Sequence, residues 1–270
     1  MRGTSRASLA SVEERFEPVL TRAGTKAAAI GEQLFAFVDA LDHSGSLRRT
    51  LADPSVPGDP KATLVAQLLA QADPATVAVA QDLVRARWSA DSDLADAAER
   101  LAFQALLAAA EAAGSLERVE EELFQLTRAL AGQREVRQAL FDDAVPGAAR
   151  AQLVDSLLAG RADAVTATLA RRAAQAPRGR RYVATLGHLG DLIAERRQRS
   201  VATVTTATPL SAAQRSRLAD ILARAYGRQV QINEVHDPHV LGGLRIQVGP
   251  NVVDATVLAR LADARRQLAS

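Results

Sequence analysis

The sequence predicts a mainly α-helical protein: two tandem helical-bundle domains of about six helices each, followed by a small α+β domain. Three observations lead to this fold class. Apolar residues recur at helical spacing from Ser8 to Arg199, interrupted by Pro and Gly. A long segment of that helical region repeats farther along the chain. After Arg199, β-branched and alternating residues appear, which favour strands.

Composition agrees with close-packed helices. Hydrophobic residues make up 48% of the 270 residues while aromatic residues make up only 3%, so the cores must consist largely of Ala, Leu and Val. The length suffices for two or three domains, each with its own core. Cysteine is absent, which excludes disulfides and thiolate metal sites.

The helical region is expected to contain eleven segments. Their limits follow the apolar periodicity and the Pro and Gly punctuation. We expect helices at about 9–23, 26–43, 45–52, 59–71, 74–88, 92–113, 115–131, 133–141, 147–159, 162–175 and 180–199.

An internal repeat runs through these helices at a constant offset. Leu34-Phe35 recurs as Leu123-Phe124, 89 residues later (123 − 34 = 89), and Val56-Pro57-Gly58 recurs as Val145-Pro146-Gly147 at the same offset. Chance alignment of Ala/Leu-rich helices does not account for the Val-Pro-Gly turn, whose Pro opens the next helix at a fixed distance from the apolar residues. We therefore infer a duplicated helical domain of roughly 90 residues, an ordinary domain size.

The C-terminal part alternates strands with a helix. Residues 200–206 are β-branched, Val230 and Ile232 belong to a further strand, and Ser211 with Gln214 forms a capping-box start for a helix. We therefore divide the chain into residues 1–94 and 95–199, the two helical copies, and residues 200–270, the small α+β domain.

The end of this domain has an ordered pattern. Leu244, Ile246 and Val248 alternate with polar residues, as in a strand with one buried face. Gly242-Gly243 supplies the turn before it, and Gly249-Pro250-Asn251 closes its far end. Asp254 is the expected N-cap of a final helix, on which Leu258, Leu261 and Leu268 share one side.

This string resembles the C-terminal signature of the delta subunit of bacterial F-type ATP synthases, whose mitochondrial counterpart is the oligomycin-sensitivity-conferring protein. The matching positions are Asp237, Pro238, Gly242, Gly243, Gly249, Asp254, Arg260 and Leu261. Thr256 stands where the family usually has Ser, and Ala255 where Gly is common. Residues 95–199 resemble the family's N-terminal six-helix domain, and the extra first copy is a feature associated with actinobacterial members.

The resemblance implies a non-catalytic stator subunit that links the catalytic alpha/beta head to the peripheral b stalk, so that proton-driven rotation is coupled to ATP synthesis. It implies one copy per complex, on the cytoplasmic face of the bacterial plasma membrane, with membrane association only through the complex. Expected partners are the alpha subunits, the beta subunit and the b-type stalk subunit.

The resemblance also implies two partner-binding regions. N-terminal helices of the alpha subunits would bind a groove between the first and fifth helices of the second copy. The residues expected there are Leu101, Phe103, Leu106, Leu107, Val165, Leu169 and Arg172. The stalk would dock on the C-terminal domain, which carries the signature residues Asp237, Pro238, Gly242, Gly243, Gly249, Asp254, Thr256, Arg260 and Leu261.

Motifs for catalysis and cofactors are not found. The sequence has no Gly-rich phosphate loop with its Lys and no nucleophile elbow. His236 and His239 flank Pro238, but no further ligand has metal-site spacing, so we expect neither a metal nor a cofactor. No stretch of about 18 uninterrupted apolar residues predicts a membrane span.

Nucleic-acid binding is the alternative function. Arginines cluster at residues 171–172, 178–181 and 196–199, which would suit a helical RNA-associated binding or regulatory protein. A net charge of +2 and a single nearby aromatic, Tyr182, argue against base stacking on a basic surface. The sequence therefore favours the stator subunit over the RNA-associated protein.

Overall fold

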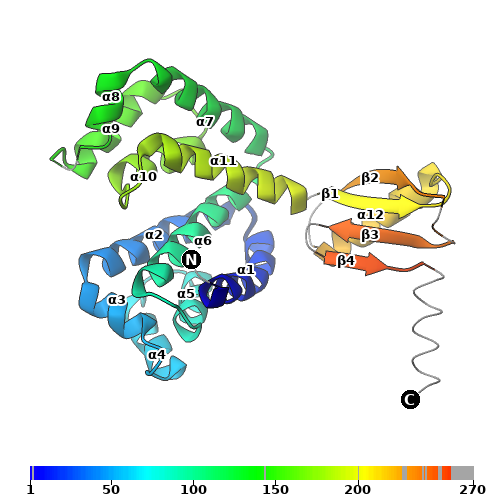
Figure 1. Ribbon diagram of the computed structural model, residues 1–270, viewed down its shortest axis with the longest axis horizontal. Coiled ribbons are helices and arrows are strands. Elements are labelled where there is room, and N and C mark those ends of the chain that lie inside the picture. Colours follow the sequence, from blue (N-terminus) through cyan, green and yellow to red (C-terminus); the bar gives the residue numbers. More distant parts are fainter. Residues whose placement is uncertain are drawn as a thin grey trace. The chain divides into compact units, whose positions relative to one another are not determined.

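The computed structural model describes residues 1, 3–142, 144–199, 201–226, 230–238, 240, 242–248 and 251–256. The chain divides into two compact units, Met1–Leu192 and Ile193–Ser270. The first is all helical and the second contains a sheet (Figure 1).

The helices of the first unit follow the predicted segments closely. Their bounds are α1 Gly3–Ala23, α2 Ala27–His43, α3 Gly45–Ala52, α4 Gly58–Leu68, α5 Pro74–Arg85, α6 Asp91–Ala112, α7 Leu116–Ala131, α8 Arg134–Ala139, α9 Gly147–Leu158, α10 Ala164–Gln175 and α11 Tyr182–Arg199, with a short 3-10 helix at Gly24–Lys26. The largest difference is at the start, where α1 begins at Gly3 rather than near residue 9.

Helix α6 belongs to both halves of the repeat. At the repeat offset, α1 corresponds to α6, and α6 in turn corresponds to α11. The helices therefore form two groups, α1–α6 and α6–α11, which we call the first group and the second group. The predicted boundary between residues 94 and 95 lies inside α6, which is buried along nearly its whole length. One shared helix thus joins the two copies.

The same local contacts recur in both groups. Lys61 Nζ donates to the carbonyl oxygen of Asp53 at 3.1 Å, and Arg150 Nη1 donates to that of Asp142 at 3.2 Å. These residues differ in number by the same 89 positions. Each cation holds the turn before the following helix, in which a Pro occupies the N-cap position.

Helices α5 and α10 also begin alike. The carboxylates of Asp73 and Asp163 each accept a hydrogen bond from the backbone N–H two residues later, as N-caps do. The backbone N–H groups of these two aspartates donate to Gln33 on α2 and Glu122 on α7, at 2.9 and 2.8 Å. Repetition of such specific contacts is what a duplicated domain predicts.

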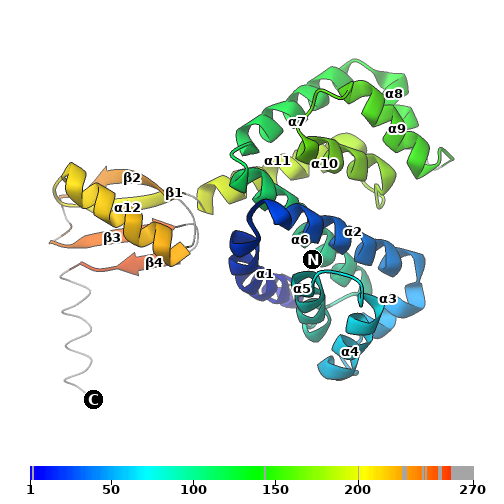
Figure 2. The ribbon, with the colours of Figure 1, turned by 180° about the vertical axis from the view of Figure 1, so that it is seen from behind.

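The second unit contains the end of α11, a four-stranded sheet and a further helix. The strands are β1 Val201–Thr206, β2 Gln231–His236, β3 Leu244–Val248 and β4 Asn251–Asp254, and the helix is α12 Ala212–Tyr226. The strand order is β2-β1-β3-β4, with β1 parallel to β2 and antiparallel to β3. Helix α12 covers one face, as Figure 2 shows.

The predicted alternation sets which face is buried. Ala202, Val204 and Val248 form the core of this unit with Leu222 of α12 and Val230, while Leu244 and Ile246 pack against it. The register of β3 therefore follows its sequence pattern.

The predicted capping box at the start of α12 is confirmed. Ser211 N–H donates to Gln214 Oε1 at 2.9 Å, and Gln214 N–H donates to Ser211 Oγ at 3.3 Å.

The sequence did not predict strand β4. Val252 and Val253 are too few to show alternation, and they become a strand because their backbone pairs with Gln247 and Ile246 of β3. Asp254 ends this strand, and its Oδ1 accepts from Thr256 N–H at 3.0 Å. The helix expected after Asp254 lies outside the described residues.

Candidate partner-binding site

The residues expected to bind an alpha-subunit helix gather where α6 passes α10. Leu101, Phe103, Leu106 and Leu107 on α6 are each at most 1% exposed. On α10, Leu169 and Arg172 are also buried and Val165 is partly exposed. Core packing accounts for the apolar character of most of these side chains, and their contact with a partner stays a prediction.

Helix α2 of the first group occupies the place expected for a partner helix. A Cβ on Gly31 would lie 2.8 Å from the carbonyl oxygen of Ala102 and 3.0 Å from Leu106 Cγ, so the glycine lets α2 approach α6 closely. Farther along, the rings of Phe35 and Phe103 meet edge to face, with centroids 5.2 Å apart. Two of the predicted groove residues, Phe103 and Leu106, thus contact α2.

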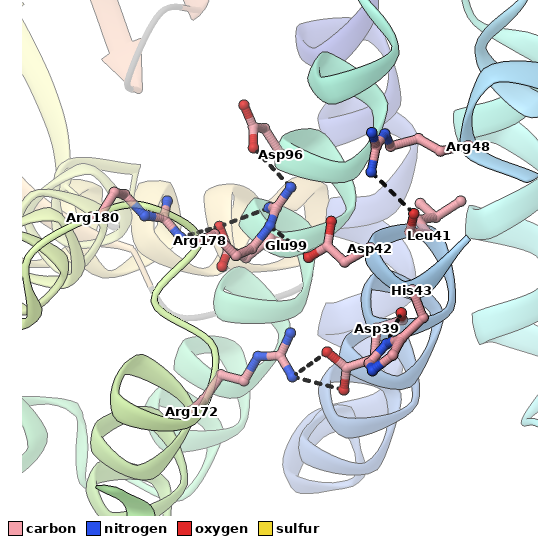
Figure 3. A network of polar contacts seen from close by, with 10 residues as sticks. All are labelled: Asp39, Leu41, Asp42, His43, Arg48, Asp96, Glu99, Arg172, Arg178 and Arg180. Atoms are coloured by element: carbon pink, nitrogen blue, oxygen red, sulfur yellow. Dashed lines mark hydrogen bonds and ion pairs between the residues drawn. The ribbon is translucent and has the colours of Figure 1, made fainter. Parts of the chain in front are cut away.

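A third groove residue, Arg172, binds α2 through charge. Its Nη1 lies 2.8 and 2.9 Å from the two carboxylate oxygens of Asp39 (Figure 3). The same guanidinium stands 4.6 Å from the centre of the Phe35 ring, a cation–π arrangement. Because Arg172 is buried, its charge requires such partners.

Two further arginines extend this network across α6. Arg178, in the connection after α10, lies 2.8 Å from Asp42 on α2, 3.1 Å from Asp96 and 3.2 Å from Glu99. Arg180 also pairs with Glu99, whose side chain is only 2% exposed. Figure 3 shows these side chains converging on α6 from both helical groups.

Burial and charge shift two titrating groups beside the network. Burial raises the pKa of Asp96, although Arg178 opposes the shift. Burial also lowers the pKa of His188 on α11, and the positive charges of Arg100 and Arg180 act in the same direction. Both shifts act in the direction of the uncharged side chain. The ion pairs of this cluster connect the first helical group to the second. The arrangement therefore suits a stabilising contact between the helical groups rather than proton transfer to a substrate.

The C-terminal signature residues form a turn against the end of the sheet. Gly242 and Gly243 have φ of 70° and 80°, the left-handed region that favours glycine. A Cβ on Gly243 would lie 2.4 Å from the carbonyl oxygen of Ala255 and 3.0 Å from Thr256 Cα. Glycine is therefore required at position 243 for two reasons: its backbone angle lies in the left-handed region, and no space is left for a side chain.

The other signature residues surround this turn. Asp237 N–H donates to the carbonyl oxygen of Thr206 at 3.0 Å, and Pro238 is exposed. Hydrogen bonds from the hydroxyl and the backbone N–H of Thr256 lower the pKa of Asp254. The remaining signature positions, Gly249, Arg260 and Leu261, lie outside the described residues, as does His239.

Sequence reasoning missed the role of α2. Asp39 and Asp42 are spaced to share one helix face, and the arginine clusters at 171–172 and 178–181 supply the opposite charge. That match was available in the sequence. The pairing joins residues 133 positions apart, so only the fold shows which clusters meet.

Several of the arginines that suggested RNA binding form ion pairs within the protein, which weakens the RNA alternative. Arg172, Arg178 and Arg180 all pair with carboxylates, and Arg171 pairs with Asp155 at 2.8 Å. Within the described ranges no group of His, Cys, Asp or Glu is arranged to hold a metal ion. The helices described here also include none long and apolar enough to cross a bilayer.

Comparison with known proteins identifies the family. The family described as ATP synthase delta (OSCP) subunit matches residues 98–268, which include most of α6, the rest of the second group and the C-terminal unit. The chain belongs to this family. The match begins within α6, so α1–α5 lie before the part common to the family.

Full-length relatives share the first group as well. The ATP synthase subunit delta of Beutenbergia cavernae is 53% identical over 270 residues, covering 100% of both chains. That of Kineococcus radiotolerans is 44% identical and covers 99% of this chain and 97% of its own. A chain in the cryo-EM structure of the Toxoplasma gondii mitochondrial ATP synthase hexamer has a TM-score of 0.32 at 19% identity, covering 62% of this chain and 95% of that one, a likeness that carries no argument.

Proposed function

We propose that this protein is a non-catalytic stator subunit of an F-type ATP synthase, which ties the catalytic head to the peripheral stalk. The observation that carries the proposal is the full-length match, at 53% identity, to an ATP synthase subunit delta. A stator must transmit torque without turning with the shaft, so it needs rigid surfaces rather than an active site. The buried α6 and the charge network around it provide such rigidity in the first unit.

The test of this function is assembly. The tagged chain should co-purify from membranes with ATPase activity, and its deletion should uncouple proton flow from ATP synthesis while hydrolysis by the detached head persists. Recovery of RNA without ATPase subunits would favour the helical RNA-associated protein instead. The proposal also places the protein on the cytoplasmic face of the plasma membrane, which protease access in inverted vesicles would check.

We propose the N-terminal helices of the alpha subunits as partners of the first unit. The predicted contacts are Leu101, Phe103, Leu106, Leu107, Val165, Leu169 and Arg172. Of these, Phe103 and Arg172 contact α2, so a partner helix would reach them only if α2 moves aside. A ligand that competes with an internal segment gains affinity when that segment is held less tightly.

This exchange is testable with a synthetic peptide of the alpha N-terminus. Asp39→Ala removes the ion pair that holds α2 to Arg172, so it should tighten peptide binding about three- to tenfold, as followed by NMR titration. Asp59→Ala, which affects an exposed pair outside the groove, is the matched control. Equal affinity of the peptide for the original protein, Asp39→Ala and Asp59→Ala would show that the peptide does not bind in the groove between α6 and α10.

The C-terminal unit is the proposed docking site of the b-type stalk subunit. Gly243→Val should disrupt the turn before β3 and destabilise this unit by about 1–3 kcal/mol, because the backbone angle disfavours a β-branched residue. Stalk binding should fall while binding to the isolated head persists. Gly187→Ala, where an added Cβ meets nothing within 4 Å, is the control. Loss of both interactions, or of neither, would contradict a two-ended stator.

A further inference from the structure

The connection between α10 and α11, residues 176–181, contains a backbone conformation that its sequence does not favour. Arg178 has a φ of 49° and Gly179 a φ of 73°. The backbone N–H of Arg180 closes the turn by donating to the carbonyl oxygen of Pro177 at 2.9 Å. Positive φ at both central residues is the geometry of a type I′ turn, which prefers Asn, Asp or Gly at the first of them. An arginine in this region is unfavourable, so other contacts must hold it there.

The side chain of Arg178 supplies those contacts. Its Nε lies 2.8 Å from Asp42 Oδ2, its Nη2 lies 3.1 Å from Asp96 Oδ1, and its Nη1 lies 3.2 Å from Glu99 Oε2. Each nitrogen of the guanidinium thus pairs with a different carboxylate, and the side chain is only 13% exposed. Charge-assisted hydrogen bonds are strong, and salt screens them least where water is excluded. The three pairs therefore compensate for the unfavourable backbone conformation.

These carboxylates belong to helices outside the connection. Asp42 lies in the last turn of α2, which belongs to the first helical group alone, while Asp96 and Glu99 lie about one turn apart on the shared helix α6. Arg180 also pairs with Glu99, so the connection meets α6 through two arginines. The first group therefore holds a segment that joins two helices of the second group.

The same connection leads directly into the start of α11. Tyr182, the first residue of this helix, is buried, and its hydroxyl donates to the carbonyl oxygen of Ala170 on α10 at 3.2 Å. A cavity of about 450 Å³ lies beside Arg180, lined also by His188 of α11 and by residues of α1 and α6. On that side the connection faces a cavity instead of close-packed side chains. Charge pairing is therefore the main contact that holds it against α6 there.

Helix α11 is also the element that joins the two compact units. It runs from Tyr182 to Arg199, and the boundary between the units falls within it, after Leu192. Force applied to the second unit therefore enters the helical unit through α11. If α11 were held only by helices of the second group, that force would pass to the second group alone. The ion pair between Arg178 and Asp42 offers a direct route to α2 as well.

We propose that residues 176–181 form a strap by which the first helical group holds the start of α11 in place, and that Arg178 keeps this strap closed. Opening of the strap breaks the three ion pairs, lets residue 178 leave the left-handed region and separates the start of α11 from α2. The inference rests on the proposed function in one respect, because the force that the strap resists is the torque on a stator. It gives the first group a role within the chain, as a support for the helix that continues into the second unit.

Hydrogen exchange followed by mass spectrometry tests the strap in the full chain. Arg178→Asn removes all three ion pairs but places in the turn a residue that favours its backbone conformation. If the ion pairs keep the strap closed, amides in residues 176–186 should exchange faster by at least about tenfold. If the turn conformation alone held the segment, exchange would be unchanged or slower, and the proposal would be wrong.

Two further variants test the role of the first group. Asp42→Asn removes the pair on α2 and leaves both pairs on α6, so it should speed exchange in residues 176–186 by about threefold or more. No change in this variant would show that the first group does not hold the strap. Arg171→Gln, the control, removes an exposed pair with Asp155 and should leave these rates unchanged.

Amides of α4 and α5 are the internal reference in every sample. Their exchange should be the same in Arg178→Asn as in the original protein, because the strap does not belong to the contacts between these two helices. An equal rise in α4, α5 and α11 would mean that Arg178 supports the stability of the whole unit and that no separate strap exists.

The support of α11 under force is measured in the assembled synthase. Membranes that carry Arg178→Asn should retain ATP hydrolysis but lose part of the proton pumping driven by it. Normal pumping together with fast exchange of residues 176–186 would overturn the supporting role and leave the stator function intact. If the chain does not associate with the synthase at all, the proposed function and the supporting role both fall, whereas the exchange rates of the isolated chain still decide whether Arg178 keeps the strap closed.

Discussion

The two helical groups have the same plan and opposite environments. The first group places Gly31, Phe35 and Asp39 on the face of α2 that meets α6 and α10, and all three make contact there. The second group places Glu120, Phe124 and Arg128 at the same positions of α7, where Phe124 is exposed. Duplication thus preserved the turns and caps, while the outer face of the second helix changed its chemistry.

The difference indicates how the repeat is used. Contacts that close each turn, such as those of Lys61 and Arg150, are internal to one group and recur in both. The face of α2 joins the two groups, whereas the corresponding face of α7 joins no third helical group among the residues that the structure describes. Terminal repeats in tandem arrays commonly differ on their outer face for this reason.

The largest expected effect comes from the two phenylalanines. Phe35→Ala should destabilise the first unit by about 3–5 kcal/mol, because it removes a buried ring that packs against Phe103 and Arg172. Phe124→Ala should change the free energy of unfolding by less than about 0.5 kcal/mol, because its ring is exposed. Urea unfolding of the two variants measures both values. Similar losses would contradict the contrast between the groups.

Gly31 and its counterpart Glu120 should give a smaller difference in stability when each is replaced by alanine. Gly31→Ala should cost about 1–3 kcal/mol, since the new methyl group would meet the backbone carbonyl oxygen of Ala102, which cannot rotate away. Glu120→Ala on α7 should instead change the free energy of unfolding by less than about 0.5 kcal/mol, because its side chain is partly exposed and the substitution adds no atoms that must be accommodated. Thermal midpoints measured side by side would test this. A stable Gly31→Ala protein would show that α2 and α6 can separate at no cost.

At the Val-Pro-Gly turns we expect the second group to be the more sensitive to substitution. A Cβ at Gly147 would lie 2.6 Å from the carbonyl oxygen of Gln175, whereas one at Gly58 would lie 3.1 Å from Arg85 Cγ, a side-chain atom that can shift. We therefore expect Gly147→Ala to cost about 1–2 kcal/mol and Gly58→Ala less than about 1 kcal/mol. Chemical denaturation ranks the two. The reverse order would mean that the connection after α10 yields more easily than Arg85 does.

The smallest effect concerns pH. The pKa of His188 on α11 lies below its usual value because burial and nearby arginines disfavour the charged ring. As the pH falls below about 6.5, the unfolded chain binds this proton before the folded protein does, so stability decreases with falling pH and is constant above that range. His188→Gln should lose less stability than the original protein between pH 7 and pH 5. Parallel urea titrations at each pH measure the difference, and identical slopes would rule out His188 as a source of acid sensitivity.

Several features could be predicted because neighbours in sequence determine them. The apolar periodicity predicted the helices to within a few residues, apart from the start of α1, and the alternation of Leu244, Ile246 and Val248 predicted β3. The capping box at Ser211 and Gln214 depends on contacts within one turn of helix. The family signature was visible for the same reason, since Gly242 and Gly243 adopt a local backbone conformation that few other residues tolerate.

The tertiary structure decided what no local pattern contains. The periodicity of α6 marks an apolar helix, but only packing shows that one helix completes the first group and begins the second. The Leu-Phe repeat makes Phe35 and Phe124 equivalent in sequence, yet Phe35 is buried against Phe103 of α6 and Arg172 of α10 whereas Phe124 is exposed. The arginine clusters likewise suggested a basic surface until the fold brought Arg172 to Asp39 and Arg178 to Glu99. Burial and charge pairing depend on residues far apart in the chain, so the sequence by itself determined the elements and the fold determined which of their faces remain available to partners.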